Sequence, residues 1–310
     1  MTDLGSLRPG GPRVVAIGGG HGLAQTLRAV RRYAGCITAI VSVADNGGSS
    51  GRLREELGMP APGDIRRCLG ALLPEVSPLG EALEHRFESG QLAGHAFGNL
   101  LIAALAASTG DFGRGVSEAG RLLGTVGTVL PATIGSVDLK AISQDGEIDG
   151  QVSIQASHGV TKLSLVPPDA LPPDGAVRAI MAAEQVVIGP GSLYTSVMAA
   201  CCVPALSDAI RATNAQRVYV VNLREQRPET AGYSVADHVE ALGRHGIAVD
   251  VVVADPRALP PGRPLPAGRS GCPPRLVLAE VGQPGYGAHD PDLLTGELEK
   301  LAGESRPLGA

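Results

Sequence analysis

The apolar positions of this 310-residue chain form short continuous runs separated by stretches of helical spacing. Residues 14–17 are a four-residue apolar run that ends in glycine, which is typical of a buried strand in a parallel sheet. Apolar residues recur at helical spacing over 23–30, and 37–43 is a second apolar run. A strand, a helix and a second strand in this order predict the start of a parallel α/β sheet.

In the middle of the chain, the predicted elements change from helices to short strands. After predicted helices over 63–73, 78–87, 99–108 and 114–123, residues 137–143 and 151–156 predict two strands around the turn signal Gln144-Asp145-Gly146. Residues 162–166 predict a third strand, and a cluster of prolines follows it. We therefore expect a small antiparallel β insertion over about 134–168.

The α/β pattern then resumes towards the C-terminus. It predicts helices over 176–183, 235–244 and 293–301, and strands over 185–188, 217–222, 248–254 and 275–279. We expect a single α/β domain over 13–304, with a Rossmann-like, doubly wound, mostly parallel sheet. Residues 1–12 are predicted to be a flexible leader and 305–310 a tail. The stretch 257–274 predicts a loop, because it carries six prolines and three glycines.

Composition narrows the function classes. The 43 glycines are roughly twice average usage, but 44% hydrophobic and 18% charged residues exclude bulk disorder. A net charge of −5 and the absence of Trp argue against nucleic-acid binding. Five cysteines without a C-x-x-C pair, no long apolar span and no apolar signal core predict a cytoplasmic protein without membrane insertion.

A glycine cluster follows the first predicted strand. Glycines let backbone N–H groups approach a phosphate closely, and the following helix N-terminus adds positive potential. The spacing is G-x-G-x-G, so it matches neither the dinucleotide fingerprint nor a P-loop. A tight strand–helix turn without ligand is the alternative. The candidate residues are Gly18, Gly19, Gly20, His21 and Gly22.

A second polar cluster follows the strand over 37–43. An acid at a strand end can bind ribose hydroxyls or a metal ion, and the residues after it offer N–H and hydroxyl donors. A flexible surface loop is the alternative. The candidate residues are Asp45, Asn46, Gly47, Gly48, Ser49 and Ser50.

Further candidates lie at later loops and helix starts. Asp64 is equally well placed as a helix cap or as a ligand-binding acid. Ser192 is not a nucleophile elbow, because Pro190 and Tyr194 occupy the two glycine places that G-x-S-x-G requires. The remaining candidates in this group are Arg66, Asn99, Gly191, Thr195, Asn222 and Tyr233.

Catalytic and metal chemistry receive little support from the sequence. His238 and Asp237 are adjacent on a predicted helix and so do not face each other. The histidines show no zinc spacing such as H-E-x-x-H, so we expect no metal and no required cofactor. The catalytic residues, and whether turnover occurs at all, stay open.

Six motifs in order closely resemble the YvcK branch of the YvcK/CofD family. They are GGGHGL, VADNGGSSGRLR, APGDIR, HAFGNLL, IGPGSLYTS and TAGYSVADHV, spread from about residue 14 to 255. The resemblance implies a Rossmann-like fold in which the loops 18–22 and 189–192 contact a nucleotide diphosphate. It also implies that Asp45, Asn222 and Tyr233 belong to the same cleft.

The resemblance further implies a UDP-sugar ligand, notably UDP-N-acetylglucosamine. Proteins of this branch are called gluconeogenesis factors and are linked to cell shape and peptidoglycan precursor synthesis during gluconeogenic growth. We expect a homo-oligomer with a cell-wall synthesis protein as partner. The alternative is a CofD-like 2-phospho-lactate transferase, which moves a phosphorus-containing group onto a deazaflavin.

Two departures from the family pattern bear on this choice. Asn46 stands where the family usually has a second aspartate, which weakens a two-acid metal site and hence the transferase alternative. Ala231 replaces the aspartate of the usual Thr-Asp-Gly-Tyr. A third hypothesis, a nicotinamide-dependent dehydrogenase, lacks the longer glycine spacing that it requires.

Overall fold

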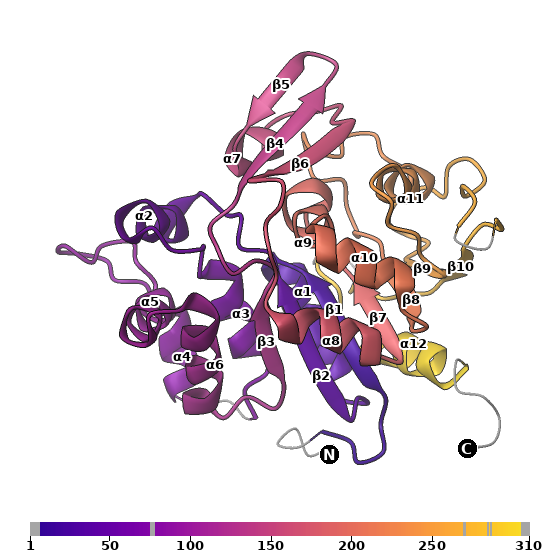
Figure 1. Cartoon of the computed structure of the whole chain (residues 1–310). Helices are drawn as coiled ribbons and strands as arrows, with labels where there is room; N and C mark the ends of the chain where they lie inside the picture. Colours follow the sequence, from indigo (N-terminus) through magenta and orange to yellow (C-terminus); the bar gives the residue numbers. More distant parts are fainter. Residues whose placement is uncertain (1–6, 75–77, 269–270, 284, 286, 305–310) are drawn as a thin grey trace.

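The fold is that of a computed structural model, which describes residues 7–74, 78–268, 271–283, 285 and 287–304. A seven-stranded parallel sheet has the order β10-β9-β8-β7-β1-β2-β3 (Figure 1). The expected α/β class, with a mostly parallel sheet, is thereby confirmed. Its strands are β1 Arg13–Gly18, β2 Cys36–Val41, β3 Thr128–Pro131, β7 Gln185–Ile188, β8 Gln216–Val220, β9 Val251–Ala254 and β10 Arg275–Leu278.

The strand order reverses beside β1. The chain proceeds from β1 through β2 to β3 on one side, then returns to β7 on the other side of β1 and continues outward. In open α/β sheets, ligands bind outside the carboxyl ends of the strands at such a switch point. Gly18 ends β1, and Gly189 follows β7, so two predicted glycine loops begin side by side there.

Helices cover both faces of the sheet. Val15 and Ile17 of β1 belong to one hydrophobic core, while Val14 and Ala16 belong to the other, as the alternation of side chains along a strand requires. The first core lies under α8 to α11, and the second lies under α1, α3, α5, α6 and α12. The helices are α1 Gly20–Val30, α2 Gly48–Leu57, α3 Gly63–Ala71, α4 Pro78–Glu84, α5 Phe97–Thr109, α6 Phe112–Leu123, α8 Asp174–Ala182, η1 Leu193–Met198, α9 Ala199–Cys201, α10 Pro204–Ala212, α11 Val235–Arg244 and α12 Pro291–Glu304.

The antiparallel insertion is present and projects from the main body (Figure 1). Its strands are β4 Asp138–Ser143, β5 Gly146–Asp149 and β6 Lys162–Val166, in the order β5-β4-β6. The strand predicted over 151–156 is wrong, because this segment is the helix α7 Gln151–Gln155. Gly150, at φ +88°, breaks the extended backbone. Ile154 then packs into the core from one turn of helix.

Several elements lack a clear signal in the sequence. Helix α2 begins inside the Gly-Gly-Ser-Ser run, which has the composition of a loop. Strand β3 has four residues, and the helices from η1 to α10 lie in an almost uniformly apolar stretch without clear periodicity. In the described part of the chain, no single helix is long and apolar enough to cross a membrane. The bent helix pair Leu193–Cys201 and Pro204–Ala212 reaches the length and apolar content of a membrane span only when its two helices are taken together.

The two ends of the chain are only partly described. Residues 1–6 and 305–310 lie outside the described residues. Within the predicted leader, the Arg8 N–H donates to the Ala34 carbonyl at 2.9 Å, and Leu7 packs on the core. The division of the chain into leader, domain and tail stays a prediction.

Candidate functional site

A cleft of about 370 Å³ lies at the switch point. The first glycine loop, the loop after β7, the ends of β2 and α3, and helix α7 of the insertion all contribute to it. Segments far apart in the sequence therefore converge on one cavity. Its lining residues are Gly19, Gly20, His21, Gly22, Ser42, Asp45, Asp64, Arg67, Gln151, Gln155, Gly191, Ser192, Thr195, Ser196 and Gln226.

The first loop requires glycine for two different reasons. Gly20 opens α1 with φ +66°, a conformation that disfavours other residues. A Cβ on Gly22 would lie 2.3 Å from the Pro190 carbonyl oxygen, so the two loops touch through bare backbone. The N-terminus of α1 thus faces the cleft, and Asp64 accepts a hydrogen bond there from the Gly20 N–H. This is the arrangement of an anion-binding helix N-terminus.

The loop after β7 is braced from behind by Asn222. The Gly191 N–H donates to Asn222 Oδ1 at 2.9 Å, and Asn222 Nδ2 donates to the Gly191 carbonyl at 2.9 Å. Gly191 has φ +148°, and its Cβ position is 3.2 Å from the Gly19 carbonyl oxygen. Asn222, a candidate ligand-binding residue in the sequence, therefore uses its amide to hold this loop in shape.

Glu229 is a buried carboxylate that sequence reasoning missed. Its Oε1 accepts from the backbone N–H groups of Tyr194 and Thr195, both at 3.1 Å, and from Thr195 Oγ1 at 3.3 Å. Burial raises the pKa of Glu229 to about 7. The carboxylate thus caps the helix that follows the Gly191 loop, and no motif in its Arg-Pro-Glu-Thr context announces this role.

Two acids and one arginine contribute charged side chains to the cleft. Asp45 and Asp64 both line the cleft, and Arg67 Nη1 donates to Asp64 Oδ1 at 2.7 Å. Burial raises the pKa of Asp64, the Arg67 charge opposes this shift, and the Asp45 charge adds to it. Asp64 lies in the first turn of α3, whose cap is Pro62, so it is not the cap itself.

Arg66, the arginine predicted for the site, points elsewhere. Successive residues of a helix differ in direction by about 100°. Arg66 consequently donates to the Leu83 carbonyl at 3.2 Å and pairs with Glu84, away from the cleft. Arg67 takes the place in the cleft that the sequence interpretation assigned to Arg66.

Other predicted residues lie behind the cleft. Ser49 bonds to His95 Nδ1 at 3.1 Å and accepts from Asn99 Nδ2 at 3.0 Å, which joins α2 to α5. Tyr194 and Tyr233 bond to each other through their hydroxyls at 2.9 Å. The side chains of Ser49, Asn99 and both tyrosines thus support the site from outside its lining. Of the other candidates, Gly18, Asn46, Gly47, Gly48 and Ser50 are likewise not among the lining residues.

Asn46 connects the insertion to the loop after β2. Its Oδ1 accepts from the Val152 N–H at 3.2 Å, at the start of α7. This bond helps to hold Gln151 and Gln155 beside the cleft, where Gln151 Nε2 donates to Gln155 Oε1 at 3.1 Å. Gln151 Oε1 is buried, and no partner for it is found among the described residues. The sequence pattern predicted a strand here, so both glutamines were missed as site residues.

A side pocket of about 200 Å³ adjoins the cleft and shares His21, Gly22, Gly191 and Gln226 with it. Here Pro190 and Asn222 of the predicted set meet Arg224 and His289. His289 Nε2 lies 3.1 Å from the Val221 carbonyl oxygen. Burial lowers the pKa of His289 to about 4, so its ring is neutral at pH 7 and Nε2 is the donor to that carbonyl.

The acids of the cleft do not form a metal centre with other side chains. Across residues 7–74, 78–268, 271–283, 285 and 287–304, no group of three or more His, Cys, Asp or Glu side chains is arranged to hold a metal ion. Asp45 and Asp64 are the acids that line the cleft.

Comparison with known proteins places this geometry in context. The family model described as "2-phospho-L-lactate transferase CofD" matches residues 14–263. The gluconeogenesis factor of Halalkalibacterium halodurans is 47% identical over 247 residues, which is 77% of this chain and 76% of that protein. A Mycobacterium tuberculosis protein named "Putative gluconeogenesis factor" is 42% identical over 316 residues, 96% of this chain and 92% of that protein.

Coverage differs among the relatives. A Nostoc protein with the same name as the mycobacterial one is 48% identical over 237 residues, which are 75% of this chain and only 52% of the Nostoc protein. A crystal structure of a UPF0052-family protein from Bacillus halodurans superposes with a TM-score of 0.75 at 44% identity, covering 78% of this chain and 80% of the other. A second crystal structure from the same organism has a TM-score of 0.82 at 36% identity and covers 94% and 99%.

Proposed function

Because the chain belongs to the CofD/YvcK family, we propose that its cleft binds a nucleotide sugar of the UDP-N-acetylglucosamine type and that binding serves regulation. The observation that carries the proposal is the meeting of two glycine loops at the switch point, with backbone contact between Gly22 and Pro190. Such paired loops offer several N–H groups to one diphosphate.

The diphosphate is assigned to the space between these loops. The N-terminus of α1 supplies positive potential and the N–H groups that follow Gly20, whose own N–H bonds to Asp64, and the Arg67 guanidinium lines the same cleft. Glu229 already occupies the N–H groups of Tyr194 and Thr195. Asn222 likewise occupies the Gly191 N–H, so the ligand relies on the α1 side and on the Ser192 backbone for its main-chain contacts.

The two ends of the ligand extend in different directions. The side pocket with Arg224 and Asn222 is assigned to the nucleoside, because it continues from the diphosphate space past His21. The amides of Gln151 and Gln155 are assigned to the sugar, because Asn and Gln side chains can both donate to and accept from hydroxyl and acetamido groups. The unpartnered Gln151 Oε1 is suited to accept one such bond.

The position of the Thr195 hydroxyl favours a regulatory role over turnover. Thr195 Oγ1 donates to the capping Glu229, which removes it as a nucleophile. As the family resemblance implies, the proposal includes a link from ligand binding to peptidoglycan precursor supply and cell shape during gluconeogenic growth. This link would act through a partner in cell-wall synthesis.

One observation favours a second candidate, a CofD-like transferase acting on a deazaflavin. Asp45 and Asp64 line one wall, and the charge of Asp45 raises the pKa of Asp64. Two carboxylates beside a diphosphate can share a divalent cation, which supports phosphoryl-group chemistry. Mass spectrometry of a reaction containing candidate donors, a deazaflavin acceptor and Mg²⁺ would reveal a transferred phosphorus-containing group.

Titration calorimetry tests the first proposal. UDP-N-acetylglucosamine should bind more tightly than UDP, because the sugar adds contacts to α7. No heat at millimolar UDP-N-acetylglucosamine, with a folded protein confirmed by circular dichroism, would exclude the nucleotide sugar. A deazaflavin product that has gained a phosphorus-containing group would instead favour the transferase candidate.

A further inference from the structure

At its last strand, the antiparallel insertion is tied to the body by two hydrogen bonds. Strand β6 is the outer strand of the order β5-β4-β6 and pairs with β4 on one side. The Leu163 N–H of β6 donates to His245 Nε2 at 2.8 Å, just after the end of α11. Two residues before β6, the Val160 carbonyl accepts from the Tyr194 hydroxyl of η1 at 2.7 Å. The segment that leads into β6 is thus bonded to two different helices of the body.

The hydrogen-bonding roles of both ring nitrogens of His245 are fixed by their partners. Nδ1 lies 2.8 Å from the Ala241 carbonyl oxygen, which can only accept, so Nδ1 carries the proton. The Leu163 N–H can only donate, so Nε2 presents its lone pair. The two bonds therefore require a neutral imidazole with its proton on Nδ1. In the imidazolium both nitrogens are donors, and Nε2–H would face the Leu163 N–H.

The surroundings of the His245 ring favour the neutral form. Burial lowers the pKa of His245, and the bond to Ala241 opposes this shift. The positive charges of Arg244, on the last turn of α11, and Lys162, on β6, lower the pKa further. From η1, the Tyr194 ring packs edge-on against the imidazole with a centroid distance of 6.3 Å, and burial raises the pKa of its hydroxyl, which stays neutral. His245 is therefore the group at this contact that changes charge between about pH 5 and 8.

The position of β6 bears on the cleft through helix α7. Helix α7 lies between β5 and β6 in the chain, and its residues Gln151 and Gln155 line the cleft. Ile154 of α7 and Leu163 of β6 are buried in the same hydrophobic core. Separation of β6 from α11 therefore removes support from the cleft wall that carries both glutamines.

We propose that His245 is a positioning residue for this cleft wall and that protonation of its ring releases β6 from α11. The release of β6 follows from the two bonds of the His245 ring, whereas its effect on sugar binding rests on the proposed function. Below pH 6.5, the ordinary pKa of histidine, the released form gains about tenfold over the docked form for each pH unit. This gain ends at the lowered pKa of the docked form, because both forms then bind the proton.

Hydrogen exchange of the Leu163 amide in the full chain, without ligand, tests the release. We expect its protection factor, corrected for the intrinsic pH dependence of exchange, to fall about tenfold or more between about pH 7.5 and pH 5. His245→Gln offers an amide oxygen to the Leu163 N–H without titrating, so its protection factor should change less than about twofold over this range. His158→Gln removes an exposed histidine from the same insertion and should behave as wild type does.

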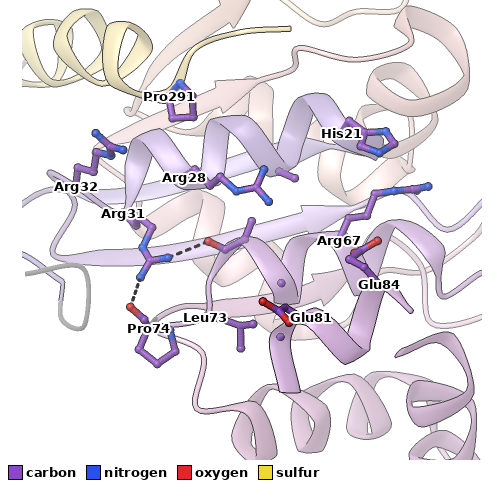
Figure 2. Close-up of a pocket in the computed structure, with 14 residues that line it drawn as sticks. His21, Arg28, Arg31, Arg32, Arg67, Leu73, Pro74, Glu81, Glu84 and Pro291 are labelled. Carbon is purple, nitrogen blue, oxygen red and sulfur yellow. Dashed lines mark hydrogen bonds between the residues drawn. The ribbon is translucent and has the colours of Figure 1, made fainter. Parts of the chain in front are cut away.

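A second histidine lies nearer to the proposed ligand and is separated from His245 by the same variant. His21 lines the cleft, and Figure 2 shows it at one end of α1 beside Arg67 of α3. Burial and then the Arg67 charge lower the pKa of His21. Its protonation affects wild type and His245→Gln alike. Calorimetry with UDP-N-acetylglucosamine should therefore give equal affinities for the two proteins at about pH 7.5, and an affinity about threefold or more weaker for wild type at about pH 5.

The outcomes separate this proposal from the proposed function. An equal fall in Leu163 protection in wild type and His245→Gln would overturn the role of His245, as would constant protection in wild type. If His245→Gln does not fold, nitrogen-15 shifts of the wild-type ring give the answer, because an Nε2–H tautomer at about pH 7.5 would also overturn it. Release of β6 in a protein that binds no nucleotide sugar would refute the proposed function and leave the role of His245 established.

Discussion

Gly191 is the position where one substitution should separate ligand binding from folding. It lies in the loop after β7, its backbone is held on both sides by Asn222, and it lines the cleft. Gly191→Asp places a carboxylate where a diphosphate is proposed to bind. We expect nucleotide binding to be lost while the fold is kept.

The magnitude follows from two separable effects. A side chain at φ +148°, with a Cβ 3.2 Å from the Gly19 carbonyl oxygen, costs about 1–3 kcal/mol of stability. A carboxylate about 4 Å from a phosphate charge is repelled by about 4 kcal/mol at an effective dielectric constant near 20. That repulsion corresponds to about a thousandfold loss of affinity.

Gly191→Ala is the matched control, because it carries the backbone strain without the charge. Calorimetry with UDP-N-acetylglucosamine should show a loss of less than about tenfold for alanine and of at least about a hundredfold for aspartate. Thermal denaturation should show similar destabilisation in both variants. Equal affinities in the two variants, or wild-type affinity in Gly191→Asp, would refute the assignment of the diphosphate to this loop.

Three further predictions concern groups around the cleft. Replacing both Gln151 and Gln155 by alanine should lower the affinity for UDP-N-acetylglucosamine about tenfold and leave the affinity for UDP unchanged, which competition titration would measure. Equal losses of affinity for both ligands would show that the two glutamines do not contact the sugar. Asn46→Ala removes the bond to Val152, so hydrogen exchange should become faster over α7, whereas Asn46→Asp, which keeps an acceptor, should retain protection. Glu229 has its pKa raised from 4.5 to about 7 in the folded state, so wild-type stability should fall as pH rises from about 4.5 to 7, by up to about 3 kcal/mol. Glu229→Gln should flatten that pH dependence in urea denaturation, and an unchanged slope would show that another group titrates.

The sign of the Glu229 effect follows from proton uptake. A raised pKa means that the folded protein binds more protons than the unfolded chain between the two pKa values, and stability then decreases as pH increases. Over the same range, the amide oxygen introduced by Glu229→Gln can still accept from the Tyr194 N–H without carrying a charge. The acceptor role and the charge are therefore tested separately.

The regular elements were predictable where they carry a strong local pattern. The buried runs of β1, β2 and β7 and the periodic helices α1 and α11 follow from short-range sequence, since burial on both sides of a parallel sheet demands continuous apolar residues. Helix α7 was missed because five residues are too few for a helical period to show. Its helical start depends on Gly150 and on a distant acceptor, Asn46.

The candidate site likewise combines features that short segments predict with features that depend on distant contacts. Glycine clusters at strand ends identified the two loops, because glycine readily adopts positive φ and its bare backbone allows contact such as that between Gly22 and Pro190. The choice of Arg67 over Arg66 depends on the rotation of α3 about its axis, which spacing alone did not resolve. Glu229 lies 34 residues from Thr195 in the sequence, and only the folded chain brings the two together.

By itself the sequence determined the α/β class, the order of the elements and the strand-end loops, because local periodicity and backbone freedom are properties of short segments. Only the tertiary structure decided which polar side chains share a cavity. Buried charges and orphaned donors must be paired across long chain distances, and that pairing depends on sheet order, helix rotation and the docking of the insertion.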